Sequence, residues 1–199
     1  MKKIGIFGGA FNPITKAHMQ VAVESMERLE LDILYFEPVG NHYEKNGLES
    51  AEDRIKMIWL ALDRYEDYTI VCGTKDALSA ELMYTYQVLE YYSHPYHELY
   101  FILGSDNLRE IDQWKNPDRI FELSNLIVHQ RSGHDVLNII GESEFLYKYE
   151  DQVYVIPSNN SLSSTLVRNW IKSGTHINSR YMDRKVMKYI QENGLYVSN

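Results

Sequence analysis

Residues 3–18 read KIGIFGGAFNPITKAH, and this stretch decides the fold. An apolar run over residues 3–7 predicts a strand, and Gly8 and Gly9 follow it directly before a helical pattern begins. Glycines at this place let backbone amides approach a phosphate closely, and the following helix N-terminus adds a partial positive charge. The stretch lacks the final Gly-Lys-Ser/Thr of a P-loop and the third glycine of the dinucleotide-binding motif G-x-G-x-x-G. It therefore predicts a phosphate-binding loop of another type.

The rest of the chain alternates strand-like and helix-like segments. Short runs rich in Ile, Val, Tyr and Phe predict six strands, at Lys3–Phe7, Ile33–Pro38, Tyr68–Cys72, Leu99–Gly104, Leu126–His129 and Val153–Ile156. Apolar residues at helical spacing predict helices between and after them: one from His18 through Leu29, one after the cap Ser50 with Ile55, Ile58, Trp59 and Leu62 inward, one over Ser79–Tyr92, one around Leu166–Ile171, and one over Asp183–Tyr196 that Gly194 ends.

This alternation predicts the fold class. Repeated strand–helix–strand units form right-handed crossovers, which give a parallel sheet with helices on both faces. We therefore expect a doubly wound α/β fold, with residues 1–199 in a single domain and a C-terminal helical portion from about residue 163. Ligands of such folds lie beyond the carboxyl ends of the strands, where the chain order reverses.

Composition narrows the function. The chain has 199 residues, a net charge of −8 and a single cysteine, Cys72. The negative charge argues against nucleic acid as a partner, because such binding normally needs a basic face. One cysteine excludes a disulfide framework and favours the cytoplasm. No apolar run approaches the roughly 18 residues of a membrane span, so we expect no membrane contact. A homo-oligomer is left open.

The loop after the first predicted strand resembles a known signature. Residues 8–18, GGAFNPITKAH, are similar to the nucleotidyltransferase hallmark (H/T)-x-x-H, with Thr15 and His18 at its two ends. The form N-P-I-T-x-x-H resembles the nicotinate and nicotinamide mononucleotide adenylyltransferase family. That family implies a Rossmann-like nucleotidyltransferase fold. Threonine at the first position can still hydrogen-bond phosphate, but it cannot carry charge.

Three more segments resemble motifs of the same family, in the same order. Residues 38–48, PVGNHYEKNGL, match the second motif, whose lysine contacts phosphates and corresponds to Lys45. Residues 104–108, GSDNL, together with Trp114 match the third motif. From the residues alone, Asp106 follows a strand-end glycine and is placed to accept ribose hydroxyl protons. Trp114 could stack on an aromatic ring or form an ordinary apolar lid.

Residues 161–168, SLSSTLVR, resemble the second family hallmark, I-S-S-T-x-(I/V)-R, with leucine in place of isoleucine at Leu162. Hydroxyl and backbone N–H groups at the start of a helix can bind a triphosphate, and the Arg168 guanidinium can donate two hydrogen bonds to its oxygens. Thr85 matches a T-x-x-V-L element that lines the pyridine-nucleotide pocket in relatives, although core packing explains it nearly as well.

The resemblance implies transfer of AMP from ATP to nicotinic acid mononucleotide or nicotinamide mononucleotide, with release of pyrophosphate in NAD biosynthesis. ATP is then a co-substrate, and Mg²⁺ is expected to be held mainly by its phosphates, with no protein metal site. The residues assigned to catalysis are His18, Thr15, Lys45 and Arg168. Those assigned to ATP are Gly8, Gly9, Ala10, Phe11, His18, Gly104, Asp106, Ser163, Ser164, Thr165 and Arg168. Those assigned to the mononucleotide are Asn12, Lys45, Thr85 and Trp114.

Two alternatives stay open at this point. A related enzyme of the same fold could join ATP or CTP to phosphopantetheine or a polyol phosphate, and Lys45 and Trp114 argue against it. A nucleotide-binding sensor without turnover is the other alternative. Thr15 in place of histidine supports it slightly, whereas His18, Lys45 and Arg168 oppose it.

Overall fold

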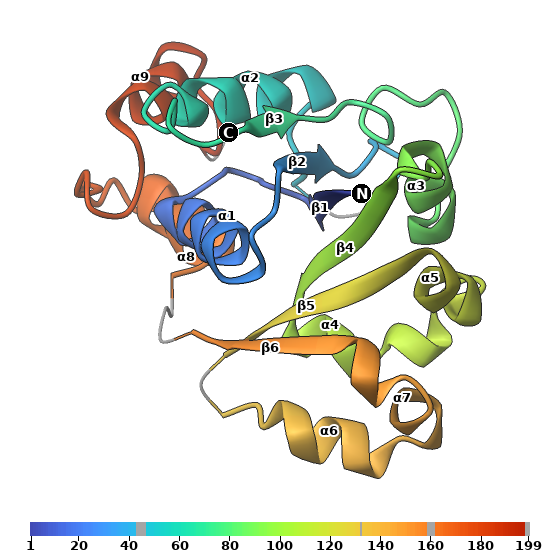
Figure 1. Cartoon of the computed structure of the whole chain (residues 1–199). Helices are drawn as coiled ribbons and strands as arrows, with labels where there is room; N and C mark the ends of the chain where they lie inside the picture. Colours follow the sequence, from blue (N-terminus) through green and yellow to red (C-terminus); the bar gives the residue numbers. More distant parts are fainter. Residues whose placement is uncertain (43–46, 132, 159–161, 198–199) are drawn as a thin grey trace.

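Six parallel strands form the centre of the molecule in the computed structural model, which describes residues 1–42, 47–131, 133–158 and 162–197 (Figure 1). The strands are β1 Lys2–Gly9, β2 Ile33–Pro38, β3 Ile70–Cys72, β4 His97–Gly104, β5 Ser124–Gln130 and β6 Val153–Pro157. They form one sheet with the order β3-β2-β1-β4-β5-β6. The predicted doubly wound α/β fold is confirmed, and each of the six predicted strands overlaps an observed one.

The order of the strands places the functional end of the sheet. β1 pairs with β2 on one side and with β4 on the other, in both cases parallel. The chain thus builds one half of the sheet from β1 outward and then returns to β1 to build the other half. The crevice beyond the carboxyl ends of β1 and β4 is the place where such folds bind ligands.

Helices cover both faces of the sheet, and alternate strand residues face the two layers. Phe7, Tyr100 and Ile102 belong to the core on one face, whereas Ile6 and Phe101 belong to the core on the other. The first layer contains α1 Lys16–Leu29, α2 Ala51–Leu62, α8 Ser164–Lys172 and α9 Arg184–Glu192 (Figure 1). The second layer contains α3 Thr85–Tyr92, α4 Ser105–Leu108, α5 Pro117–Leu123, α6 Val136–Glu142 and α7 Glu144–Tyr147. Short 3-10 turns lie at Ile111–Gln113 and Glu150–Gln152.

The predicted start of α2 is correct, but one residue of its apolar stripe was misplaced. The Ser50 hydroxyl accepts a hydrogen bond from the backbone N–H of Asp53 at 3.0 Å and so caps the helix. Ile55 and Ile58 are buried as expected. Trp59, which the stripe placed inward, is 57% exposed, because it lies one position round the helix from the buried row.

The third predicted helix is shorter than the sequence indicated. Only Thr85–Tyr92 is helical, and the residues from Ser79 to Tyr84 are not. The Ser79 hydroxyl donates to the carbonyl of Glu81 at 2.7 Å and accepts from its N–H at 3.2 Å, which closes a local turn instead of a helix. Serine side chains compete with helical hydrogen bonds in this way. The α4, α5, α6 and α7 helices were not predicted.

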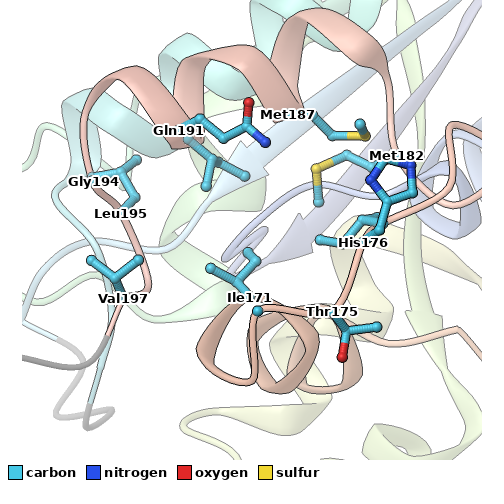
Figure 2. A pocket seen from close by; sticks show the side chains of 12 residues that line it. Ile171, Thr175, His176, Met182, Met187, Gln191, Gly194, Leu195 and Val197 are labelled. Carbon is cyan, nitrogen blue, oxygen red and sulfur yellow. The ribbon is translucent and has the colours of Figure 1, made fainter.

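The last helix ends two residues before Gly194, which has a left-handed backbone with φ of +59°. The tail beyond it does not continue the helix as far as Tyr196. A hollow of about 340 Å³ lies between α8 and α9, with Gly194, Leu195 and Val197 of the tail in its wall (Figure 2). Over the residues that the structure describes, no helix combines the length and apolar character needed to cross a membrane.

Candidate active site

Two adjoining cavities lie at the carboxyl ends of β1 and β4. The first, of about 150 Å³, is bordered by α1 and by the residues that follow β5, and is called the α1 lobe. The second, of about 240 Å³, is bordered by the start of α3 and is called the α3 lobe. Both have Gly8, Gly9, Leu103 and Asn107 in their walls. A ligand that crosses these residues would occupy both lobes.

His18 borders the α1 lobe from the first turn of α1. Its Nδ1 accepts a hydrogen bond from the backbone N–H of Thr15 at 3.0 Å, so the neutral ring carries its proton on Nε2. Burial, with a smaller contribution from the positive charge of Arg131, lowers the pKa of His18 to about 4. At neutral pH the side chain is therefore an uncharged hydrogen-bond donor.

Aromatic packing and a capping interaction hold the His18 ring in place. The Phe11 ring meets it edge-on, with the ring centroids 5.3 Å apart and an interplanar angle of 81°. Phe11 has a φ of +45°, a left-handed conformation that residues with a side chain adopt at a cost. Thr15 is 2% exposed, and its hydroxyl lies 3.0 Å from Nδ1 of His18. Thr15 thus contacts His18 from behind and does not border either lobe.

Asn12 is also buried, at 5% exposure, and its side-chain amide is used within the protein. Nδ2 donates to the carbonyl of Gly47 at 2.7 Å, and Oδ1 accepts from the N–H of Glu49 at 3.1 Å. Oδ1 also accepts from the hydroxyl of Tyr196 at 2.8 Å. Asn12 therefore joins the first loop to the segment that follows β2 and to the C-terminal tail.

The two loop-to-helix junctions predicted from the sequence meet in the structure. The Ser164 hydroxyl donates to the carbonyl of Pro13 at 2.8 Å, and Nη1 of Arg168 donates to the carbonyl of Asn12 at 2.7 Å. Nη2 of Arg168 donates to the Thr165 hydroxyl at 3.1 Å. The first turn of α8 is thereby fixed to the loop that precedes α1, although 151 residues separate Pro13 from Ser164. Ser163 caps α8 by accepting from the N–H of Leu166 at 3.2 Å.

Gly104, Asp106 and Arg131 form the far wall of the α1 lobe. A Cβ at position 104 would meet the Asp106 carboxylate, which would have to move to make room for it. The Arg131 guanidinium lies 3.5 Å from Asp106, and the backbone N–H of Arg131 donates to the buried Ser105 hydroxyl at 3.1 Å. A carboxylate and a cation thus stand together at the rim of this lobe.

The α3 lobe has a more apolar wall. Trp114 packs edge-on against Phe101 with centroids 6.1 Å apart, and Thr85, the first residue of α3, borders the same cavity. Ala10 of the first loop lies in this wall too. The lobe brings together two of the residues that the sequence assigned to the mononucleotide.

Several residues of these walls were not identified from the sequence, among them Arg131, Asn107, Glu37 and Asp76. Arg131 directly follows the end of β5, and Asn107 lies three residues beyond the end of β4, which is a signal that every strand exit should be inspected. Glu37 and Asp76 line the α3 lobe and had no motif to mark them. One predicted residue, Lys45, lies outside the described residues.

Comparison with known proteins agrees with this geometry. Residues 6–170 match the model of a family described as cytidylyltransferase-like. The chain belongs to this family. A relative from Clostridium acetobutylicum, named "Probable nicotinate-nucleotide adenylyltransferase", is 36% identical over 99% of this chain and 100% of its own length. A relative of the same name from Clostridium botulinum is 34% identical and covers 98% of each chain. The resemblance found in the sequence motifs is confirmed.

A solved structure has the same fold as this chain. It is titled "Plasmodium falciparum nicotinic acid mononucleotide adenylyltransferase complexed with NaAD", and it superposes with a TM-score of 0.81 at 23% identity. The superposition covers 98% of each chain. The same Plasmodium falciparum enzyme complexed with APC gives a TM-score of 0.78 at 22% identity.

Proposed function

We propose that this chain transfers the adenylyl group of ATP to nicotinic acid mononucleotide and releases pyrophosphate, a step of NAD biosynthesis. The observation that carries the proposal is the pair of lobes that meet at Gly8 and Gly9, with His18 beside the junction. Two substrates that react end to end need such a site. The names of the relatives support nicotinic acid mononucleotide as the acceptor, and nicotinamide mononucleotide is the second acceptor to test.

We assign ATP to the α1 lobe and the mononucleotide to the α3 lobe. The α1 lobe has the donors that a polyphosphate needs, namely His18 and Arg131, and Asp106 can accept from ribose hydroxyls. The α3 lobe has Trp114, whose ring can stack on a pyridine, and Thr85 at a helix start. The reacting phosphates then lie over the backbone of Gly8 and Gly9, where glycines permit close approach.

The reaction is a direct displacement at phosphorus. An oxygen of the mononucleotide 5′-phosphate attacks the α-phosphorus of ATP and forms a new P–O bond. The bond from that phosphorus to the bridging oxygen of the β-phosphate breaks, and pyrophosphate leaves with the electron pair. Catalysis of such transfers consists mainly of alignment and of stabilising the charge that spreads over the phosphate oxygens.

His18 is the residue that we propose to donate to the α-phosphate. Its Nδ1 is already bound to the Thr15 N–H, so Nε2–H is the proton that can face a phosphate oxygen. Because burial lowers the pKa of His18, the ring stays neutral at neutral pH. Its Nε2–H can then donate a hydrogen bond to the phosphate without transferring the proton. Thr15 acts on the phosphate through His18, as a positioning residue, since its side chain is buried behind that ring.

The start of α8 is proposed to hold the departing phosphates. The Ser164 hydroxyl donates to Pro13, whereas the Ser163 and Thr165 hydroxyls accept from protein N–H groups. The O–H groups of Ser163 and Thr165, together with the N-terminus of α8, can therefore donate to a phosphate. Arg168 donates one hydrogen bond to the Asn12 carbonyl and one to the Thr165 hydroxyl. We propose that its remaining N–H groups donate to phosphate oxygens of ATP. Lys45 is proposed from its motif alone to contact phosphate.

We propose that Mg²⁺ enters with ATP, held by its phosphates and water. Within residues 1–42, 47–131, 133–158 and 162–197, no group of three or more His, Cys, Asp or Glu side chains is placed to hold a metal ion. The ion would lower the charge repulsion between the two substrates. We also propose that the reaction takes place in the cytoplasm.

The test is to incubate the full chain with Mg-ATP and, separately, nicotinic acid mononucleotide, nicotinamide mononucleotide and phosphopantetheine. Products are identified by mass, and pyrophosphate release is measured in parallel. We expect a dinucleotide from the first acceptor, and a parallel reaction with CTP in place of ATP should be much slower. A product from phosphopantetheine alone would identify another transferase, and binding without pyrophosphate release would identify a sensor.

A further inference from the structure

The C-terminal tail contains a buried tyrosine, Tyr196, whose hydroxyl bonds to Asn12 of the phosphate-binding loop. Tyr196 is 6% exposed. Tyr196 also has a φ of +64°, which is unfavourable for a residue with a Cβ. Something specific must therefore hold it in this position.

The hydrogen bonds described for Tyr196 lead to the active-site loops. Its hydroxyl donates to Oδ1 of Asn12 at 2.8 Å, and its backbone N–H donates to Oε1 of Glu49 at 3.1 Å. The backbone N–H of Glu49 donates to the same Oδ1 of Asn12 at 3.1 Å. Tyr196, Asn12 and Glu49 thus form a closed ring of hydrogen bonds.

Asn12 passes this restraint to both halves of the site. Its carbonyl accepts from Arg168, and its Nδ2 donates to the carbonyl of Gly47. The buried Arg54 adds a second clamp, since it donates to the carbonyls of Ala10 and Glu49 at 3.0 Å each. The first loop, the segment that follows β2 and the start of α8 therefore all contact the ring that Tyr196 closes.

The residues of the tail next to Tyr196 border a hollow. Gly194, Leu195 and Val197 border the hollow between α8 and α9, and Val197 is exposed (Figure 2). The tail leaves α9 through a hydrogen bond from the N–H of Leu195 to the carbonyl of Ile190 at 3.0 Å. Tyr196 is consequently the last described side chain of the tail that is buried in the core.

We propose that Tyr196 is a positioning residue for adenylyl transfer, whose hydroxyl fixes Asn12 and thereby the phosphate-binding loop and the start of α8. The inference rests on the proposed function. Removing the hydroxyl leaves Oδ1 of Asn12 with one donor instead of two and lets the loop move relative to His18 and Arg168. Small misplacements of reacting groups lower turnover more than they weaken substrate binding.

The test uses Tyr196→Phe in the full chain, with Tyr189→Phe as the matched control. Tyr189 is also a C-terminal tyrosine, but its hydroxyl donates to Oδ1 of Asp53 on α2 at 2.7 Å and does not reach the loop. We expect Tyr196→Phe to lower kcat about tenfold with both KM values within about twofold, and Tyr189→Phe to leave kcat within about twofold. Activity is measured well below the melting temperature of each variant.

A second readout does not depend on activity. Hydrogen exchange of peptides that span residues 8–18 and 47–54 should become faster in Tyr196→Phe and stay as in the wild type in Tyr189→Phe. Unchanged kcat in Tyr196→Phe, or equal losses in both variants, overturns the proposal. If the wild type shows no adenylyl transfer, the proposed function is wrong. Hydrogen exchange still tests the structural part of the inference, because unchanged exchange in Tyr196→Phe would show that Tyr196 does not hold the loop.

Discussion

The α1 lobe and the α3 lobe share a wall but differ in charge. Of the described residues that border either cavity, Arg131 in the α1 lobe is the one Lys or Arg. The α3 lobe instead has the carboxylates of Glu37 and Asp76 together with the Trp114 ring. A chain with a net charge of −8 must meet an anionic ligand by local cations or amides. The difference indicates that the lobes recognise their ligands by different means.

The carboxylates of the α3 lobe are engaged in holding its wall. Oε1 of Glu37 accepts from the N–H of Asp76 at 2.8 Å, and Oε2 accepts from the Tyr92 hydroxyl at 2.5 Å. Burial raises the pKa of Glu37 above its ordinary value. Asp76 in turn accepts from the N–H of Gly40 at 3.1 Å. Shape and stacking are therefore expected to govern the α3 lobe, and charge the α1 lobe.

The largest effect is expected where the lobes meet. His18→Ala removes the donor proposed for the α-phosphate and should lower kcat by about 10²-fold or more, the usual cost of deleting one preorganised donor. Steady-state kinetics with both substrates checks this, and the exposed His94→Ala is the control. Turnover near that of the wild type would remove His18 from the proposed mechanism.

A substitution confined to the α1 lobe should affect one substrate. Arg131→Met deletes the cation beside Asp106, and we expect the KM for ATP to rise about tenfold, as for one charge-assisted contact. The KM for the mononucleotide should stay within about twofold, because Arg131 borders only the α1 lobe. Arg109→Met, at an exposed arginine, is the control. Equal changes in both KM values would contradict the assignment of the lobes.

Much of the fold could be predicted because it depends on local patterns. The six strands are short apolar runs, and the loop from Gly8 to His18 carries its glycines and histidine in one stretch. The helices α5 and α6 were missed because they are only seven residues each and have few apolar positions to show a period. Residues 79–84 were predicted helical because Leu82 matched the period, yet Leu82 is exposed and a serine turn is formed there.

The site was predictable to a lesser degree. Its motifs mark the residues that meet at the two junctions, but a motif does not say which atom faces the ligand. Asn12 was assigned to substrate, and the structure shows its amide bound to Gly47, Glu49 and Tyr196. That last contact joins residues 184 apart, and no local pattern could reveal it. Whether Asn12 also touches substrate stays a prediction.

Trp114→Ala sharpens the comparison from the side of the α3 lobe. Loss of one aromatic stack should raise the KM for the mononucleotide about fivefold and leave the KM for ATP unchanged. Kinetics with each substrate varied in turn checks this. Trp59→Ala is the matched control, since Trp59 lies exposed on α2. If the two tryptophan variants behave alike, Trp114 is only an apolar lid, and the α3 lobe does not recognise its ligand by stacking on this ring.

The smallest effect concerns stability and the back wall of the α1 lobe. His129 is 3% exposed, its Nε2 lies 2.9 Å from the Ser25 hydroxyl, and burial, with a smaller contribution from Arg28, lowers its pKa from 6.5 to about 4. The folded ring thus resists protonation, so the unfolded chain binds more protons below pH 6.5, and this group makes the protein less stable as the pH falls toward 4.

Between pH 7 and pH 6 this group should cost the wild type about 0.7 kcal/mol of unfolding free energy, and His129→Gln should lack that loss. Urea unfolding at the two pH values measures it, with the exposed His94→Gln expected to keep the wild-type pH dependence. Since His18 has the same lowered pKa, part of the slope should persist in His129→Gln. If the unfolding free energy of wild type and His129→Gln changed equally with pH, the folded protein would tolerate a charged imidazole at position 129. The α1 lobe would then gain a cation when His129 is protonated.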